Sequence, residues 1–174
     1  MQWYDHVSED AKAAFYLFLT EKVLDKISHY EWFHHVKETM NMCWNWIEER
    51  GWSGHDLYER LDDEESETGL FSIHMNEVDA GLDDDEDELA FFCVIDAVAY
   101  TVWQACKYEE KGYVPQAIEV VNDEFTDGEF MRKICQIHDY QEEWAERLKQ
   151  YLMKNHLAGS DKKIQREELL SLIL

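Results

Sequence analysis

Two pairs of side chains have the spacing of metal ligands on a helix. Glu31 and His34 match the Glu-x-x-His step of di-iron helix bundles, and Cys135 and His138 are spaced in the same way. A di-iron site needs a second such step with further glutamates, and structural zinc needs four ligands at short spacing. Neither set is complete. The pairs therefore predict an ordinary surface pair and a buried thiol beside a hydrogen-bonded histidine, with no metal or cofactor.

Other sequence signatures of catalysis or ion binding are incomplete as well. The chain has no GxSxG, Walker A, GxGxxG or HExxH motif. A calcium loop counted from Asp79 places Asp84 where an EF-hand needs Gly and Ala90 where it needs Glu. The EF-hand match fails. Weak divalent-cation binding through charge density alone stays open as an alternative, because carboxylates suit hard cations.

One carboxylate, Asp96, lies within a long apolar run. A carboxylate in such a run is costly unless it is paired or hydrogen-bonded. It could be a catalytic acid with a raised pKa, but the sequence places no nucleophile or base beside it. We expect a structural buried residue, tied to Lys, Arg, Trp or a backbone group.

Acidic side chains are concentrated in one part of the chain. Residues 59–88 hold 14 acids and one base, a net charge of −13 out of −23 for the whole chain. The run at 83–88 is consecutive, and its mutual repulsion costs stability unless a basic partner, a cation or a helix dipole offsets it. The run at 62–67 could also be a solvated face. The predicted partner-binding residues are Asp83, Asp84, Asp85, Glu86, Asp87 and Glu88, followed by Asp62, Asp63, Glu64, Glu65 and Glu67.

Composition narrows the classes of partner. The 16 basic and 39 acidic residues argue against nonspecific binding to nucleic acid or anionic membranes, because phosphates would be repelled. A basic protein is the expected partner. The first residues lack the basic and apolar regions of a signal peptide, and the four cysteines lie in apolar stretches. We therefore expect reduced, buried thiols in a cytoplasmic protein, monomeric or a small homo-oligomer.

The elements that must position these residues are helices. One Pro and seven Gly leave few turns for an all-β fold, whereas apolar residues recur at spacings of three and four. Ser8 is expected to cap a helix over about 9–27, and Ser28 to open a capping box for a helix that Gly51 ends. Further helices are expected at 53–61, from Pro115 through Val121, from a capping box at 126–129 to about His156, and in the last residues.

The most apolar run, Leu89–Cys106, predicts the central helix of the fold, spanning about 84–111. A membrane span is disfavoured by its marginal length, by Asp96 and by its acidic flanks. A helix that is apolar all round packs in a core, and the preceding acids suit its N-terminal dipole. We predict a single all-α domain over residues 1–174, with six or seven helices around this one and at most a minor strand near 70–76.

Several short motifs resemble one family. They are Trp44-x-Trp46, Ile95-Asp96-Ala97, the stretch from Tyr113-Val114-Pro115 to Ile118-Glu119, and Asn122-Asp123-Glu124. Together with the helix order over about 10–155, they resemble the Imm6 family of all-α immunity proteins from bacterial polymorphic toxin systems. The resemblance implies a cytoplasmic inhibitor that binds and blocks a cognate toxin domain. It carries over no catalytic residue and implies no enzyme activity.

The electrostatics agree with that implication. Nuclease toxins bind phosphate and are commonly basic, and a dense acidic surface could occupy such a site as a phosphate mimic and speed encounter. Two alternatives stay open. One is an acidic DNA-mimic inhibitor from a phage or mobile element that acts on a basic defence protein. The other is a metal-assisted enzyme with a site around Asp96.

Overall fold

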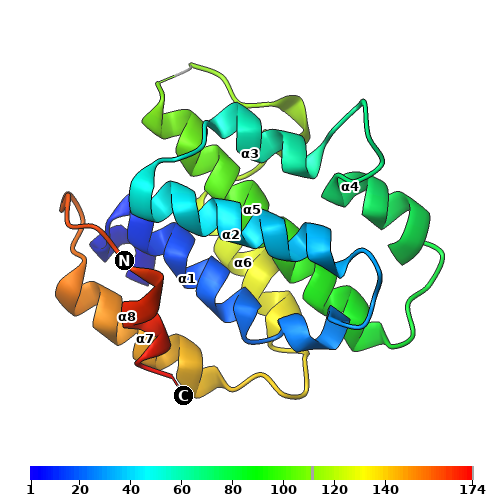
Figure 1. Cartoon of the computed structure of the whole chain (residues 1–174). Helices are drawn as coiled ribbons and strands as arrows, with labels where there is room; N and C mark the ends of the chain where they lie inside the picture. The colour runs from blue at the N-terminus through cyan, green and yellow to red at the C-terminus, as the bar shows by residue number, and fades with distance from the viewer. Residues whose placement is uncertain (111, 174) are drawn as a thin grey trace.

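The computed structural model describes residues 1–110 and 112–173, and these residues are helical throughout the core (Figure 1). The α-helices are α1 (Glu9–Glu21), α2 (Phe33–Glu49), α3 (Gly54–Leu61), α4 (Leu70–Ile73), α5 (Asp85–Tyr108), α6 (Asp123–Ile134), α7 (Glu142–Asn155) and α8 (Arg166–Leu170). Shorter 3-10 turns are η1 (Trp3–His6), η2 (Leu24–Ile27) and η4 (Gln116–Ile118), and η3 (His74–Val78) is a π-helical turn. The all-α prediction is confirmed: the described residues form eight α-helices, that is, seven besides α5.

Helix α5 is the centre of the fold, as its apolar sequence predicts. It contacts α1, α2, α3 and α6, which surround it in Figure 1. Tyr100 and Phe91 on α5 are fully buried, and they face Tyr16 on α1 and Trp32 before α2. The most apolar 18-residue window of α5 is long and apolar enough to span a membrane, but 72% of it is buried inside the protein. The apolar side chains of α5 therefore pack in the core of the protein.

The first helix begins where the sequence indicates and ends earlier. The Ser8 hydroxyl accepts a hydrogen bond from the backbone N–H of Ala11 at 3.3 Å, which confirms the predicted N-cap. Instead of continuing to residue 27, α1 stops at Glu21 and the chain tightens into η2. The predicted capping box at Ser28 is wrong. Ser28 follows η2 and its hydroxyl donates to the carbonyl of Asp25, so α2 begins only at Phe33.

The expected minor strand near 70–76 does not form. This segment is α4 followed by η3, because its buried residues do not alternate along the chain. Leu70, Ile73 and Val78 face the core, whereas Met75 is 65% exposed. Helical spacing brings the three buried side chains to one face, which a strand would not do.

The second predicted capping box is also wrong, and the helix expected after it is divided in two. Asn122 caps α6 by accepting from the N–H of Phe125 at 2.8 Å, and Thr126 is buried within that helix. The chain leaves the helix after Ile134 and resumes in α7 at Glu142. Buried Ile137 anchors the intervening turn. Apolar residues keep their helical spacing across the break between α6 and α7, so the sequence pattern gives no sign that the helix ends there.

Candidate functional site

The first acidic run lies in the loop between α3 and α4. Asp62 accepts a hydrogen bond from the Tyr58 hydroxyl at 3.1 Å. Asp63 accepts from the Ser66 hydroxyl at 2.7 Å and from the backbone N–H of Glu65 at 3.0 Å. The hydrogen bond from Ser66 helps to hold the pKa of Asp63 below its usual value. These two carboxylates therefore shape the loop.

The second run forms the start of α5, and half of it has structural partners. Asp84 caps the helix by accepting from the N–H of Glu86 at 2.8 Å. The Glu86 carboxylate lies 3.2 Å from Lys26 Nζ and accepts from the backbone N–H of His138 at 2.5 Å. Hydrogen bonds to Asp139 and Glu86 raise the pKa of Lys26. Glu86 thus ties α5 both to η2 and to the turn before α7.

Asp87 is the buried carboxylate of the second run, and it has a hydrogen-bond partner. It is 5% exposed and accepts a hydrogen bond from the Tyr30 hydroxyl at 2.7 Å. That hydroxyl in turn accepts from the backbone N–H of Asp83 at 2.9 Å. Burial and the hydrogen bond to Asp87 raise the pKa of Tyr30 to about 12. Tyr30 and Asp87 therefore join the 28–32 segment to the first turn of α5.

The remaining carboxylates of the two runs are available to a partner. Within the described part of the chain, most of them make no side-chain hydrogen bond or ion pair. The exposed side chains of this kind are Glu64, Glu65, Glu67 and Asp85, and Glu88 is partly exposed. Asp83 is also exposed, and its carboxylate lies 3.3 Å from His29 Nε2. The acids of the second run thus divide into two groups. The inner carboxylates Asp84, Glu86 and Asp87 bond within the fold, whereas Asp83, Asp85 and Glu88 are exposed or partly exposed.

A groove of about 730 Å³ separates the start of α2 from α4 and η3. Both acidic runs reach it, the first through Glu67 and the second through Asp83. Glu31 and Glu77 line the same groove, and no Lys or Arg among the described residues lines it. We call it the α2–α4 groove; it lies at the right of Figure 1, where the segment before α2 approaches η3. The fold thus brings together carboxylates that are far apart in the sequence.

The aromatic residues of this groove come from the segment before α2. Tyr30 and Trp32 stack with ring centroids 4.9 Å apart and planes 6° from parallel. Trp32 is 8% exposed, and its indole N–H has no hydrogen-bond partner among the described residues. His29, His34 and His35 also line the groove, and burial lowers the pKa of His35. Sequence analysis missed this arrangement, since no motif connects residues 29–35 with residue 67 or 77.

Asp96 lies at an ion pair between α5 and α6. Its carboxylate is 2.6 Å from Lys133 Nζ, and the two side chains are 16% and 15% exposed. Burial raises the pKa of Asp96, and the hydrogen bond from Lys133 opposes that shift without cancelling it. The structure therefore places Asp96 beside one cation in a packed interface.

The pairs with metal-ligand spacing do not form metal centres. His34 Nδ1 lies 2.9 Å from the backbone carbonyl of Glu31, so their contact does not involve the carboxylate. Cys135 and His138 are both exposed, which corrects the expectation of a buried thiol at Cys135; the other three cysteines are buried. In residues 1–110 and 112–173, no group of three or more His, Cys, Asp or Glu is placed to hold a metal ion.

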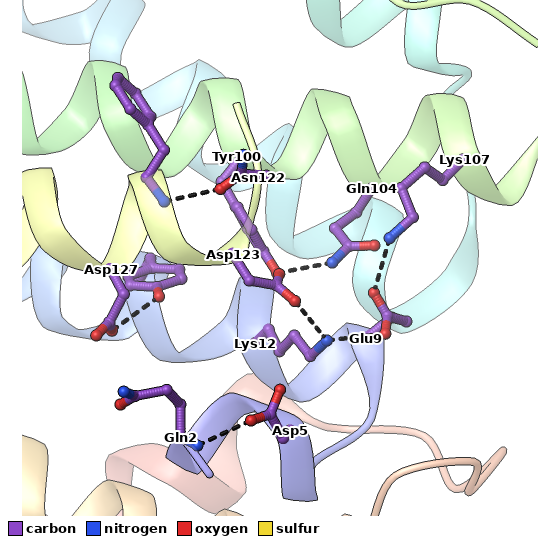
Figure 2. A network of polar contacts seen from close by, with 12 residues as sticks. Gln2, Asp5, Glu9, Lys12, Tyr100, Gln104, Lys107, Asn122, Asp123 and Asp127 are labelled. Carbon is purple, nitrogen blue, oxygen red and sulfur yellow. Dashed lines mark hydrogen bonds and ion pairs between the residues drawn. The ribbon is translucent and has the colours of Figure 1, made fainter. Parts of the chain in front are cut away.

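A second polar cluster, which the sequence analysis did not single out, joins α1, α5 and α6 (Figure 2). Lys12 Nζ lies 2.9 Å from Glu9 and 3.0 Å from Asp123, and the Lys12 side chain is only 9% exposed. Asp123 also accepts from the Tyr100 hydroxyl at 2.6 Å, which accepts from Gln104 at 2.7 Å. The lone Lys12 within the apolar run after Ser8 is the signal that could have found this cluster.

The cluster forms one wall of a cavity of about 700 Å³. Lys107 pairs with Glu9 at 3.2 Å. Arg50 Nη2 donates to both carboxylate oxygens of Asp10, and its guanidinium packs against the rings of Trp46 and Tyr108. Among the described residues, the cavity is lined by four cations and four acids: Lys12, Arg50, Lys107 and Lys163 with Asp5, Glu9, Asp10 and Asp161. This region is therefore nearly neutral, in contrast to the α2–α4 groove.

The fold and the surface define an acidic, all-α protein in which four carboxylates line one groove and whose described residues form no metal cluster. A family model, Immunity protein Imm6, matches residues 11–137, which covers α1 through α6. The chain belongs to the Imm6 immunity protein family, as its motifs indicate. No curated protein and no solved structure matches it.

Proposed function

We propose that this chain binds a cognate bacterial toxin domain and blocks it with its acidic face, without catalysing a reaction. The family implies a toxin-immunity role. The observation that carries the finer proposal is the set of exposed carboxylates at 64–67 and at the start of α5, of which Glu67 and Asp83 line the α2–α4 groove. A basic, nuclease-like toxin domain is the partner that this face fits, because its phosphate-binding site attracts carboxylates.

The inhibition would be occlusion with electrostatic steering. Exposed like charges raise the encounter rate with an oppositely charged protein, and salt screens that effect over about 10 Å at 0.1 M. The inner carboxylates Asp84, Glu86 and Asp87 are already used within the fold. The rest of the face can meet the partner without unfolding any element. The cytoplasm, where a toxin-producing cell must protect itself, is the proposed location.

The test is the association rate with the toxin domain encoded beside this gene, at low and high salt. The acid-face variant combines Glu64→Gln, Glu65→Gln, Asp83→Asn and Asp85→Asn, which spares the three inner carboxylates. The control variant combines Glu119→Gln, Glu124→Gln, Glu142→Gln and Glu167→Gln, all exposed and outside residues 62–88. Both variants change the net charge equally.

We expect the acid-face variant to associate at least about tenfold more slowly at low salt and to lose most of its salt dependence. The control variant should keep most of its association rate at low salt and most of its salt dependence. Circular dichroism and thermal melts establish that each variant is folded. An unchanged association rate in a folded acid-face variant would overturn the proposal. Inhibition of a basic defence protein, with no binding to the neighbouring toxin, would favour the DNA-mimic alternative.

A further inference from the structure

We propose that the α2–α4 groove is the pocket in which an arginine side chain of the toxin is bound. This inference rests on the proposed function and names the group that the acidic face recognises. The groove has the volume of a specific binding site, about 730 Å³, within the range of roughly 300–1,000 Å³ typical of pockets for small groups. It is therefore a concave feature and not only a charged surface.

Charge within the groove favours a cation. The lining carboxylates are Glu31, Glu67, Glu77 and Asp83, and none of the first three has a hydrogen bond or ion pair with a described residue. The first turn of α2 also borders the groove, and its dipole contributes only about half a positive charge. The three unpaired carboxylates outweigh that contribution even with Asp83 placed 3.3 Å from His29 Nε2. A concave wall of low dielectric constant focuses their field, so an entering cation gains more than it would on a flat surface.

Tyr30 and Trp32 form an aromatic wall of the groove, and this wall favours a planar cation that belongs to a peptide chain. Guanidinium groups stack on aromatic faces and pair with carboxylates through two parallel hydrogen bonds, whereas an ammonium group is a compact point charge. Tyr30 and Trp32 supply stacked rings in this wall. Trp32 is 8% exposed, and its unpartnered indole N–H belongs to a side chain that lines the groove. That N–H is a donor for a backbone carbonyl of the bound segment, because indole can only donate.

The wall is held in place before a partner arrives. The Tyr30 hydroxyl is fixed between the Asp87 carboxylate at 2.7 Å and the backbone N–H of Asp83 at 2.9 Å. Trp32 packs edge-on against Phe91 of the central helix, with ring centroids 5.3 Å apart. A preorganised pocket loses little conformational entropy on binding. The buried part of the second acidic run therefore positions the groove that its exposed part borders.

The first experiment needs no toxin. N-acetyl-arginine amide and N-acetyl-lysine amide are titrated into the full chain while the indole N–H signals are followed by NMR; Trp32→Phe assigns the Trp32 signal. We expect a saturable shift of that signal with the arginine probe and at least about threefold weaker binding of the lysine probe. Absence of a saturable shift, or equal binding of both probes, would overturn the proposal.

A matched pair of variants locates the binding. Glu67→Gln with Glu77→Gln removes two groove carboxylates, and Glu64→Gln with Glu65→Gln removes two exposed carboxylates outside the groove. The first pair should weaken arginine binding at least about tenfold and speed toxin dissociation by a similar factor, since truncated central contacts act mainly on the dissociation rate. The second pair should change only the toxin association rate.

Failure of this inference and failure of the proposed function give different results. If both pairs slow toxin association equally and neither changes dissociation, the acidic face steers the toxin and the groove proposal is wrong. If the arginine probe binds in the groove but neither pair affects the toxin, the toxin-binding role of this face is wrong.

Discussion

Replacing Asp87 by Ala tests whether the second acidic run is partly structural. The change removes a hydrogen bond from the Tyr30 hydroxyl to a charged acceptor, which contributes about 1.5–3 kcal/mol. It also removes a carboxylate from the first turn of α5, which contributes about 0.3–1 kcal/mol. The Tyr30 hydroxyl still accepts from the Asp83 N–H, and because Tyr30 is partly exposed, the O–H that loses Asp87 can donate to water and adds little to the cost. We expect Asp87→Ala to lower the free energy of unfolding by about 2–4 kcal/mol.

The assay is urea unfolding followed by Trp fluorescence, with Asp85→Ala as the control. Asp85 lies in the same first turn, is exposed and has no side-chain partner among the described residues, so its loss should cost less than about 1 kcal/mol. At this chain length the Asp87→Ala melting temperature should fall by about 5–15 °C. A double-mutant cycle with Tyr30→Phe should give a coupling energy of about 1–2 kcal/mol. Equal losses in Asp85→Ala and Asp87→Ala, or no coupling to Tyr30, would refute the reasoning.

The other predictions concern the buried ion pairs. Asp96→Ala should cost about 1–3 kcal/mol in urea unfolding because it leaves Lys133 with only the more distant Glu129, at 3.8 Å, and Asp96→Asn should cost less; equal costs would contradict the pairing. Lys12→Met should destabilise the fold by about 3 kcal/mol, since it leaves Glu9 and Asp123 without their shared cation. Burial alone would raise the pKa of Glu9, but hydrogen bonds from Lys12 and Gln104 hold it below its ordinary value of 4.5. A depressed carboxyl pKa gives stability that is present above the unfolded-state value and lost as pH falls through the folded-state value. Unfolding followed from about pH 5 to pH 3 should therefore show a shallower acid loss in Lys12→Met than in the parent chain, and parallel curves would argue against this role of Lys12.

The family match ends before the last two helices. Residues 11–137 include the central helix, the α2–α4 groove and the ion pair of Asp96. Helix α7 packs on α1 and η1, and α8 also contacts α1. His156 before α8 is fully buried, with Nε2 3.3 Å from Glu168. Helix α7 thus covers the side of α1 where Trp3 packs, and Arg166 at the start of α8 pairs with Glu21 at the end of α1.

The fold class and the central helix can be predicted from the amino-acid sequence alone. The run Leu89–Cys106 is too apolar for any surface position, so it had to be buried, and the acids before it suit the N-terminus of α5. The helix caps could not all be predicted from their local motifs. Ser8 was predicted correctly because its hydroxyl acts on the next turn, whereas Ser28 and Thr126 fit the capping pattern and were not used as caps. A short capping motif shows which hydrogen bonds a side chain could make, and tertiary packing determines whether those hydrogen bonds form.

The division of the acidic residues was decided only by the tertiary structure. Asp85 and Asp87 are indistinguishable in sequence, yet Asp87 is buried against Tyr30 and Asp85 faces solvent. The helical period of α5 turns one toward the 28–32 segment and the other away from it. The α2–α4 groove has the same origin, because Glu67 and Asp83 meet Trp32 only after α4 and η3 fold beside α2. Composition set the sign of the surface charge, and long-range packing determined which charges remain free to bind a partner.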